Sequence, residues 1–224
     1  MSAIPDPRVA AVTSATPSRS ERIAPRLVID ASVLPDVVFG RRALTWWATM
    51  GFMLVEGTTL GVVAVSYLYL RINAAEWPPR PASAPALLLP TIGMLALLVK
   101  CVPMLLASRA AQRMDFGATR RWMIVTTLVA AVTVVIRWFE FKHSLNVRWD
   151  TNAYGSALWA VYFAHTTLMV TDLLEIGSIA AIFVAGRVEP KHYPDVEDSA
   201  VYEYFLSAAW VVLYAIVVLG PRVL

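Results

Sequence analysis

The sequence predicts an all-α, polytopic integral membrane protein, a bundle of five transmembrane helices. Of its 224 residues, 58% are hydrophobic and 16% are charged, and the mean hydropathy is +0.61. This composition is too apolar for a soluble domain of the same length. Five apolar runs reach or approach the roughly 20 residues that a helix needs to span a bilayer. They cover residues 44–70, 86–107, 122–139, 155–185 and 200–219.

Residues 1–40 precede the first run and are rich in proline, serine, alanine and arginine. They lack the apolar core of a secretory signal, and their composition gives them little to bury. We interpret them as a mobile cytoplasmic tail and residues 41–224 as the membrane domain.

The distribution of lysine and arginine predicts that the N-terminus lies inside and the C-terminus outside, because cytoplasmic loops carry the excess of positive charge. Five spans also place the two ends on opposite sides. The net charge of +3 therefore reports topology and contact with membrane lipids, and we expect no nucleic-acid partner. The inner side holds Arg8, Arg19, Arg22, Arg26, Arg41, Arg42, Arg109, Arg113, Arg120, Arg121, Arg187 and Lys191, and the outer side holds Arg71, Arg80, Lys142, Arg148 and Arg222.

Cysteine and histidine are too few for several kinds of site. Cys101 is the only cysteine, which excludes an internal disulfide and a cysteine-pair metal or redox motif. Only His165 of the three histidines lies in a predicted span, whereas a haem-copper centre needs several imidazoles. The sequence also has no Gly-rich phosphate loop, nucleophile elbow or HExxH motif. We therefore expect neither catalysis nor a cofactor or metal on the isolated chain.

The first span carries one carboxylate, Glu56, near its middle. An acid at that depth costs about 2.5–3.5 kcal/mol on insertion scales, so Glu56 should face protein or water. Thr49 precedes it by seven residues and Tyr67 follows it by eleven, which at about 3.6 residues per turn places all three along one line. Gly57 and Gly61 lie on another face and indicate close approach by a neighbouring helix.

A second polar group lies in the fourth span and consists of His165, Asp172 and Glu175. His165 and Asp172 are two turns apart and share a face, while Glu175 lies further around the helix. Three interpretations stay open: a buried hydrogen-bonded cluster, a proton- or water-accessible group of carboxyls, and a metal site. The metal site would need Glu56 or Glu203 as additional ligands.

Two basic residues, Lys100 and Arg137, lie in spans or at their ends. We expect both side chains to reach the membrane interface, as long cationic side chains do. Arg137 also precedes Glu140 by three residues, a spacing that allows the two to pair along the helix. Pro90 and Pro103 interrupt the second run, and we expect them near its ends or at a kink.

The order and spacing of these motifs resemble subunit III of the haem-copper respiratory oxidases, the cytochrome c oxidase type, in its short five-helix bacterial form. The resemblance runs over residues 46–221. Its anchors are Glu56, 67–71 (YLYLR), 77–79 (WPP), 139–141 (FEF), 152–156 (NAYGS), His165 and 196–198 (VED).

The chain departs from the family at several of these positions. Leu168 stands where the family has a second histidine, and the run Glu203-Tyr204-Phe205 stands where it has Trp-His-Phe. Val55 precedes the intramembrane acid in place of a serine. The resemblance is therefore that of a divergent member.

The resemblance implies a non-catalytic accessory subunit that supports aerobic electron transport, proton uptake and complex stability. It implies that haem and copper are held by partner subunits I and II, that phospholipid binds this chain, and that the complex lies in the bacterial cell inner membrane. Glu56, His165 and Glu140 match polar positions of the family. We expect Glu56 and His165 to lie close together across the bundle, with Asp172 or Glu175 replacing polar groups at the departed positions.

Three other functions are compatible with parts of the pattern. A subunit III-like protein also accompanies nitric oxide reductases. A small integral-membrane lipid enzyme would need His165, Asp172 and Glu175 to converge on an open cleft. A transporter would need discontinuous helices near the membrane midplane. The accessory subunit needs instead a broad apolar face for a large partner.

Overall fold

The computed structural model describes residues 37–223, so the predicted tail lies outside the described residues apart from 37–40. Within 37–223, five helices are long and apolar enough to cross a membrane, and there is no strand. The predicted all-α fold is confirmed, whereas the orientation stays a prediction. The helices are α1 (Leu44–Ile72), α2 (Leu88–Gln112), α3 (Phe116–His143), α4 (Ala153–Val184) and α5 (His192–Tyr214), which continues through a π-helical turn (Ala215–Leu219) into the short α6 (Gly220–Val223).

Side-chain caps fix where two of the helices begin. Asp115 Oδ1 accepts a hydrogen bond from the Ala118 N–H (3.0 Å) at the start of α3, and Asn152 Oδ1 accepts one from the Gly155 N–H (2.8 Å) at the start of α4. These oxygens satisfy amide groups that a first helical turn leaves without a partner. A Cβ at Gly155 would lie 2.3 Å from the Arg148 carbonyl oxygen, so the chain needs glycine for this close approach.

Every spanning helix extends beyond the apolar run that predicted it at one end or both, and α3 and α5 do so most. Helix α3 exceeds the predicted 122–139 at both ends, and α5 begins at His192 instead of residue 200. Polar first turns are helical as well, because Pro194 loses no helical hydrogen bond there and Asp195 faces the positive end of the helix dipole. Hydropathy marks only the apolar middle of a helix. As a result Glu203 lies in the middle of α5.

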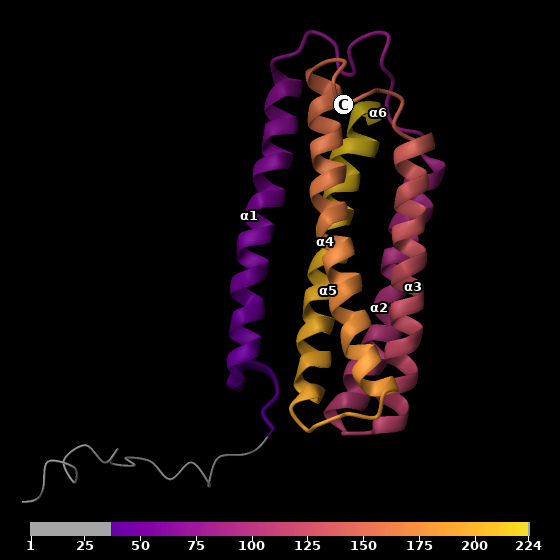
Figure 1. The fold of residues 1–224 in the computed structure, drawn as a ribbon. Helices are drawn as coiled ribbons and strands as arrows, with labels where there is room; N and C mark the ends of the chain where they lie inside the picture. The colour runs from indigo at the N-terminus through magenta and orange to yellow at the C-terminus, as the bar shows by residue number, and fades with distance from the viewer. Residues whose placement is uncertain (1–36, 224) are drawn as a thin grey trace, which may run out of the picture. The chain divides into compact units, whose positions relative to one another are not determined.

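Successive helices run in opposite directions (Figure 1). The start of α1 and the α2–α3 and α4–α5 connections therefore share one end of the bundle, which we call the α4–α5 end. Helix α2 packs against α3 and α5, and α4 packs against α1, α3 and α5. Helix α1 is peripheral, because 11% of its spanning window is buried against 28–44% for the other four.

Aromatic side chains close the opposite end of the bundle. The Trp77 ring of the α1–α2 connection packs edge-on against Tyr67 of α1 (centroids 5.2 Å apart) and Tyr154 of α4 (5.0 Å). Tyr67 and Tyr154 are fully buried. This packing ties the connection and the first span to the bundle, and the charged side chains buried beyond it form the candidate site.

Candidate functional site

The buried stripe of α1 contains the intramembrane acid. Glu56, Leu60, Ala64 and Tyr67 are the buried residues of this helix, and Thr49 is half-buried. The structure thus places Glu56 and Tyr67 on the inward face, as their spacing predicts. The predicted glycine contact is only partly present: a Cβ at position 57 would touch the Phe205 ring at 3.4 Å, and one at position 61 would meet nothing within 4 Å.

Glu56 lies next to residues that line a polar cleft between α1, α4 and α5. It lies beside Tyr202 of α5 and in the field of Glu175 of α4, and its Oε2 has no hydrogen-bond partner within residues 37–223. Thr49, Glu175 and Tyr202 line a pocket of about 260 Å³. A second pocket of about 520 Å³ is also lined by Thr49 and Glu175 and reaches the α4–α5 end at His192, Asp195 and Asp198. We call these two pockets the acidic cleft.

Glu175 belongs to this cleft through a hydrogen bond. Its Oε1 accepts from the Ser199 hydroxyl of α5 at 2.6 Å. The two residues join α4 to α5 beside the cleft. Glu175 is therefore a wall of the cleft near Glu56 and lies apart from His165.

Lys100 lies in the interior of the bundle and joins two carboxyl groups there. The sequence instead predicts that its side chain reaches the membrane interface. Its side chain is 1% exposed, and its Nζ lies 2.7 Å from Asp172 Oδ2 of α4. The same Nζ also contacts Glu203 Oε2 of α5, and both acids are fully buried. The predicted snorkelling of Lys100 is wrong, because two acids from other helices offer its ammonium closer partners than the interface does. We call Lys100, Asp172 and Glu203 the buried triad.

Hydroxyl and thiol groups complete the surroundings of the triad. Ser207 Oγ lies 3.0 Å from Glu203 Oε1, to which it donates, and Cys101 Sγ lies 3.4 Å from the same hydroxyl. The triad thus connects α2, α4 and α5 through charged hydrogen bonds, which are stronger than neutral ones. The sequence pattern predicted Asp172 as a member of a polar group and Glu203 only as a possible additional metal ligand. No local pattern indicates that Lys100, 72 residues before Asp172, completes the triad.

Arg137 is a second cationic residue whose side chain lies in the interior and not at the membrane interface. Its side chain is 1% exposed, and Nη1 lies 2.9 Å from Glu140 Oε2, so the predicted pairing along α3 is confirmed and the predicted snorkelling is wrong. Its guanidinium also lies 3.6 Å from the centre of the Trp210 ring and 5.1 Å from that of Tyr162. A planar guanidinium stacks on aromatic rings, which explains why Arg137 stays inside.

His165 belongs to the arginine's surroundings. Its ring lies 4.6 Å from Trp210, and its Nε2 lies 3.1 Å from the Leu206 carbonyl oxygen, to which it donates. Within residues 37–223 no hydrogen bond joins it to Glu56, and the predicted closeness of Glu56 and His165 stays a prediction. Glu56 instead lies in the field of Asp172 and Glu175, and seven residues of helix place Asp172 about 10 Å from His165 along α4.

The fourth-span residues therefore divide among three environments. Asp172 belongs to the triad, Glu175 to the acidic cleft, and His165 to the layer around Arg137. His165 and Asp172 are both fully buried, in keeping with the face that their spacing predicts. Within 37–223, no three histidine, cysteine, aspartate or glutamate side chains are placed to hold a metal ion.

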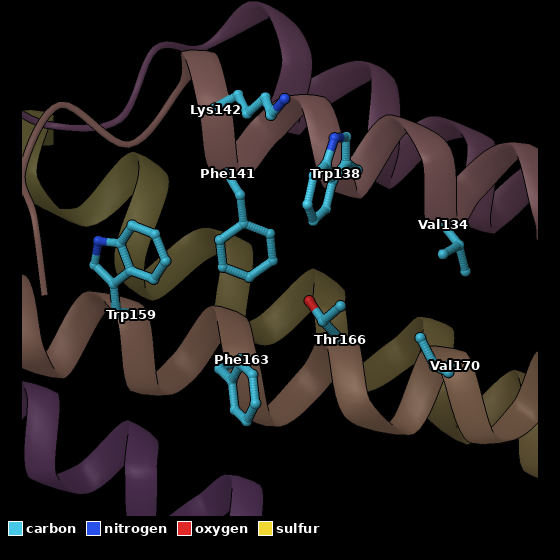
Figure 2. A pocket seen from close by; sticks show the side chains of 8 residues that line it. All are labelled: Val134, Trp138, Phe141, Lys142, Trp159, Phe163, Thr166 and Val170. Atoms are coloured by element: carbon cyan, nitrogen blue, oxygen red, sulfur yellow. The ribbon is translucent and has the colours of Figure 1, made fainter.

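An apolar groove lies between α3 and α4. Figure 2 shows Trp138 and Phe141 of α3 opposite Trp159 and Phe163 of α4, with Lys142 at one end. The groove encloses about 510 Å³, and the Lys142 ammonium lies 5.1 Å from the Trp138 ring centre. The aromatic residues at helical spacing in both segments are the sequence signal that could have predicted it.

Gly93→Ala should displace the Glu140 carboxylate and lower the stability of the folded chain. A Cβ at position 93 would lie 2.1 Å from Glu140 Oε1. Overpacking of this kind costs about 1–3 kcal/mol. Gly61→Ala is the matched control, since a Cβ there meets nothing within 4 Å and alanine favours a helix by about 0.5–1 kcal/mol. Unfolding of both variants in detergent measures the difference, and equal stabilities would contradict this packing.

The curated relatives of this chain include three proteins of one kind, while no protein-family model matches the chain. The chain is 25% identical to a probable cytochrome c oxidase subunit 3 from Nocardia farcinica, over 66% of this chain and 74% of that protein. It is 26% identical to a probable cytochrome c oxidase subunit 3 from Mycobacterium leprae (48% and 54%), and 23% identical to cytochrome c oxidase subunit 3 from Bacillus subtilis (76% and 84%). With its five helices long and apolar enough to span a membrane, the chain is a multi-pass membrane protein that is similar to cytochrome c oxidase subunit 3.

Proposed function

We propose that this chain is an accessory subunit of a respiratory haem-copper oxidase and has no redox centre of its own. The observation that carries the proposal is its similarity to proteins named cytochrome c oxidase subunit 3, over 66% and 76% of its length in two of them. In this proposal, subunits I and II hold the haem and copper, and the complex lies in the bacterial inner membrane.

The exposed face of α1 supports a role inside a larger membrane complex. Leu54, Val55, Val62, Val65 and Tyr69 are 61–72% exposed and form a large apolar surface on a helix with few contacts of its own. Large contiguous apolar faces mark contacts with lipid or with another protein. We propose that the catalytic subunit covers part of this face.

Two further features suit the supporting roles expected of such a subunit. The acidic cleft brings carboxyl groups from the α4–α5 end toward Glu56, which suits proton uptake by the complex. The groove of Figure 2 suits a phospholipid, with an acyl chain among the aromatic rings and an anionic headgroup near Lys142. Both roles are proposals for this chain.

The described residues do not have the arrangement that the lipid-enzyme alternative requires. It needs His165, Asp172 and Glu175 on one open cleft, and only Glu175 lines the acidic cleft. The transporter alternative needs spans that are broken near the midplane, and the described spanning helices run without such a break. Neither alternative is favoured by an observation of its own. The nitric oxide reductase alternative differs from the oxidase proposal in the gas that the complex consumes, nitric oxide instead of oxygen.

Deleting the gene should shorten the working life of an oxygen-consuming haem-copper oxidase in the membranes of the native host. The catalytic subunits keep their haem and copper in this proposal, so initial turnover survives while activity decays sooner. Oxygen and nitric oxide consumption are followed over many turnovers, with the intact gene restored in a control strain. A defect in nitric oxide reduction alone would favour the alternative, and unchanged activity and lifetime for both gases would contradict an accessory role.

Glu56→Gln should lower the turnover or the lifetime of the complex while leaving its assembly intact. The amide keeps the shape of the side chain and removes its capacity to exchange a proton. Glu76→Gln is the control, because Glu76 is an exposed loop acid paired with Arg80. Oxygen consumption by purified complexes measures the effect. Unchanged turnover and lifetime would reduce Glu56 to a structural role.

A further inference from the structure

The buried triad contains more acid than base. Its two carboxylates and one ammonium would together carry one net negative charge, while all three side chains are at most 1% exposed. An uncompensated charge in a low-dielectric interior is costly, and more so in a membrane domain. The structure therefore calls for one additional positive charge at this place.

No side chain of the described residues supplies that charge. Helix α3 contributes Arg137, which is paired with Glu140. The carboxyl groups that act on the triad from outside it are Glu56 from α1 and Glu175 from α4, both in the field of Asp172, and they add to the negative potential there. The other titratable side chains that face the triad are Cys101 of α2, His165 of α4, and Tyr202 and Tyr204 of α5.

We propose that Lys100, Asp172 and Glu203 form an intramembrane proton-binding site that holds one dissociable proton on its pair of carboxyl groups. Two carboxyls that share one site do not both ionise readily, because each ionised group opposes the charge of the other. The bound proton converts one carboxylate into a neutral carboxylic acid, and the remaining carboxylate balances the ammonium. The reaction is simple protonation and needs no further reactant.

The geometry also indicates where the proton lies. Glu203 Oε1 accepts from Ser207, and Glu203 Oε2 and Asp172 Oδ2 both contact the ammonium. Asp172 Oδ1 is buried and has no partner within residues 37–223, although the Asp172 and Glu203 carboxyls lie within hydrogen-bonding reach of each other. A proton on either carboxyl, donated toward the other, satisfies this oxygen.

Infrared spectroscopy of the full chain in lipid vesicles tests the proposal, because a protonated carboxylic acid has a carbonyl stretch that a carboxylate lacks. Wild-type spectra should contain such a band, sensitive to deuterium exchange, that Glu203→Gln removes. Asp172→Asn should remove the same band, since the surviving carboxyl then pairs one to one with Lys100. Lys100→Met should double its intensity, because both acids then carry protons.

The Arg137–Glu140 pair provides the matched control. It is equally buried but has one cation for its one acid, so Glu140→Gln should leave the band unchanged. A raised pH should remove the band from the wild type as the proton dissociates. Gln and Asn keep the shape of the acids, so these variants are expected to fold.

Two results would overturn the proposal. The first is a wild-type spectrum with no protonated-acid band attributable to Asp172 or Glu203 at any pH at which the chain stays folded. The second is a band that persists unchanged in both Glu203→Gln and Asp172→Asn. Neither result depends on which oxidase or reductase the chain joins.

Discussion

Lys100→Met should cause the largest loss of stability among single substitutions in the described bundle. The change leaves Asp172 and Glu203 facing each other in the interior without their ammonium. Removing one partner of a buried ion pair costs about 3–5 kcal/mol. Denaturant unfolding in detergent or lipid measures the loss. Lys142→Met is the control, since Lys142 is exposed and its replacement should change the free energy of unfolding by less than about 0.5 kcal/mol.

The loss in Lys100→Met should also grow with pH. Both acids must take up a proton for the variant to fold, so the folded state binds more protons than the unfolded chain. Its stability therefore falls as the pH rises, by about 1.4 kcal/mol per pH unit for each proton taken up. Combining Lys100→Met with Asp172→Asn and Glu203→Gln should remove this pH dependence. A Lys100→Met variant as stable as the wild type at every pH would contradict the buried triad.

Arg137→Met should give the second large loss. It leaves Glu140 buried without a cation and removes the guanidinium from the Trp210 and Tyr162 rings. We expect the free energy of unfolding to fall by about 3–5 kcal/mol. Arg137→Lys should recover only part of it, because an ammonium keeps the charge and lacks the planar group that stacks on the rings. The measurement is again denaturant unfolding.

The double variant Arg137→Met/Glu140→Gln separates the charge from the packing. With the acid neutral, the unpaired buried carboxylate is gone, so the double variant should be more stable than Arg137→Met alone. The remaining deficit measures the contact with the Trp210 ring. Additive losses from the two single substitutions would show that the residues do not interact, which contradicts a contact of 2.9 Å.

The fold was largely predictable because a spanning helix is a local pattern. Twenty or so apolar residues predict the span, and the caps at Asp115 and Asn152 lie within three residues of the groups that they satisfy. The start of α5 was missed because its first turns are polar. Hydropathy does not detect a helix that begins outside the apolar layer.

The candidate site was less predictable because its contacts join distant helices. Periodicity places Glu56 and Tyr67 on one face of α1 but does not say which residue lies opposite. Lys100 is paired with an acid 72 residues away. The rule that long cationic side chains reach the membrane interface considers one helix alone, so it predicted the wrong location for Lys100. Arg137 was half predicted, since its acid is local and its aromatic neighbours are not.

Different parts of the helix bundle have different structural roles. Charged groups bind α2, α4 and α5 together through the triad, and Arg137 of α3 stacks on Trp210 of α5. Helix α1 contributes Thr49 to the acidic cleft and places Glu56 beside it, while most of the surface of this helix stays apolar and exposed. A stable core with one peripheral helix suits a subunit that supports a larger membrane complex.

Affinity purification of the tagged full chain in mild detergent tests the proposed function most directly. The companions are identified by mass spectrometry, and haem is read from the reduced-minus-oxidised absorbance spectrum. We predict that the chain recovers oxidase subunits I and II together with their haem absorbance. Recovery of a colourless, self-contained protein without any haem-containing companion would contradict the account.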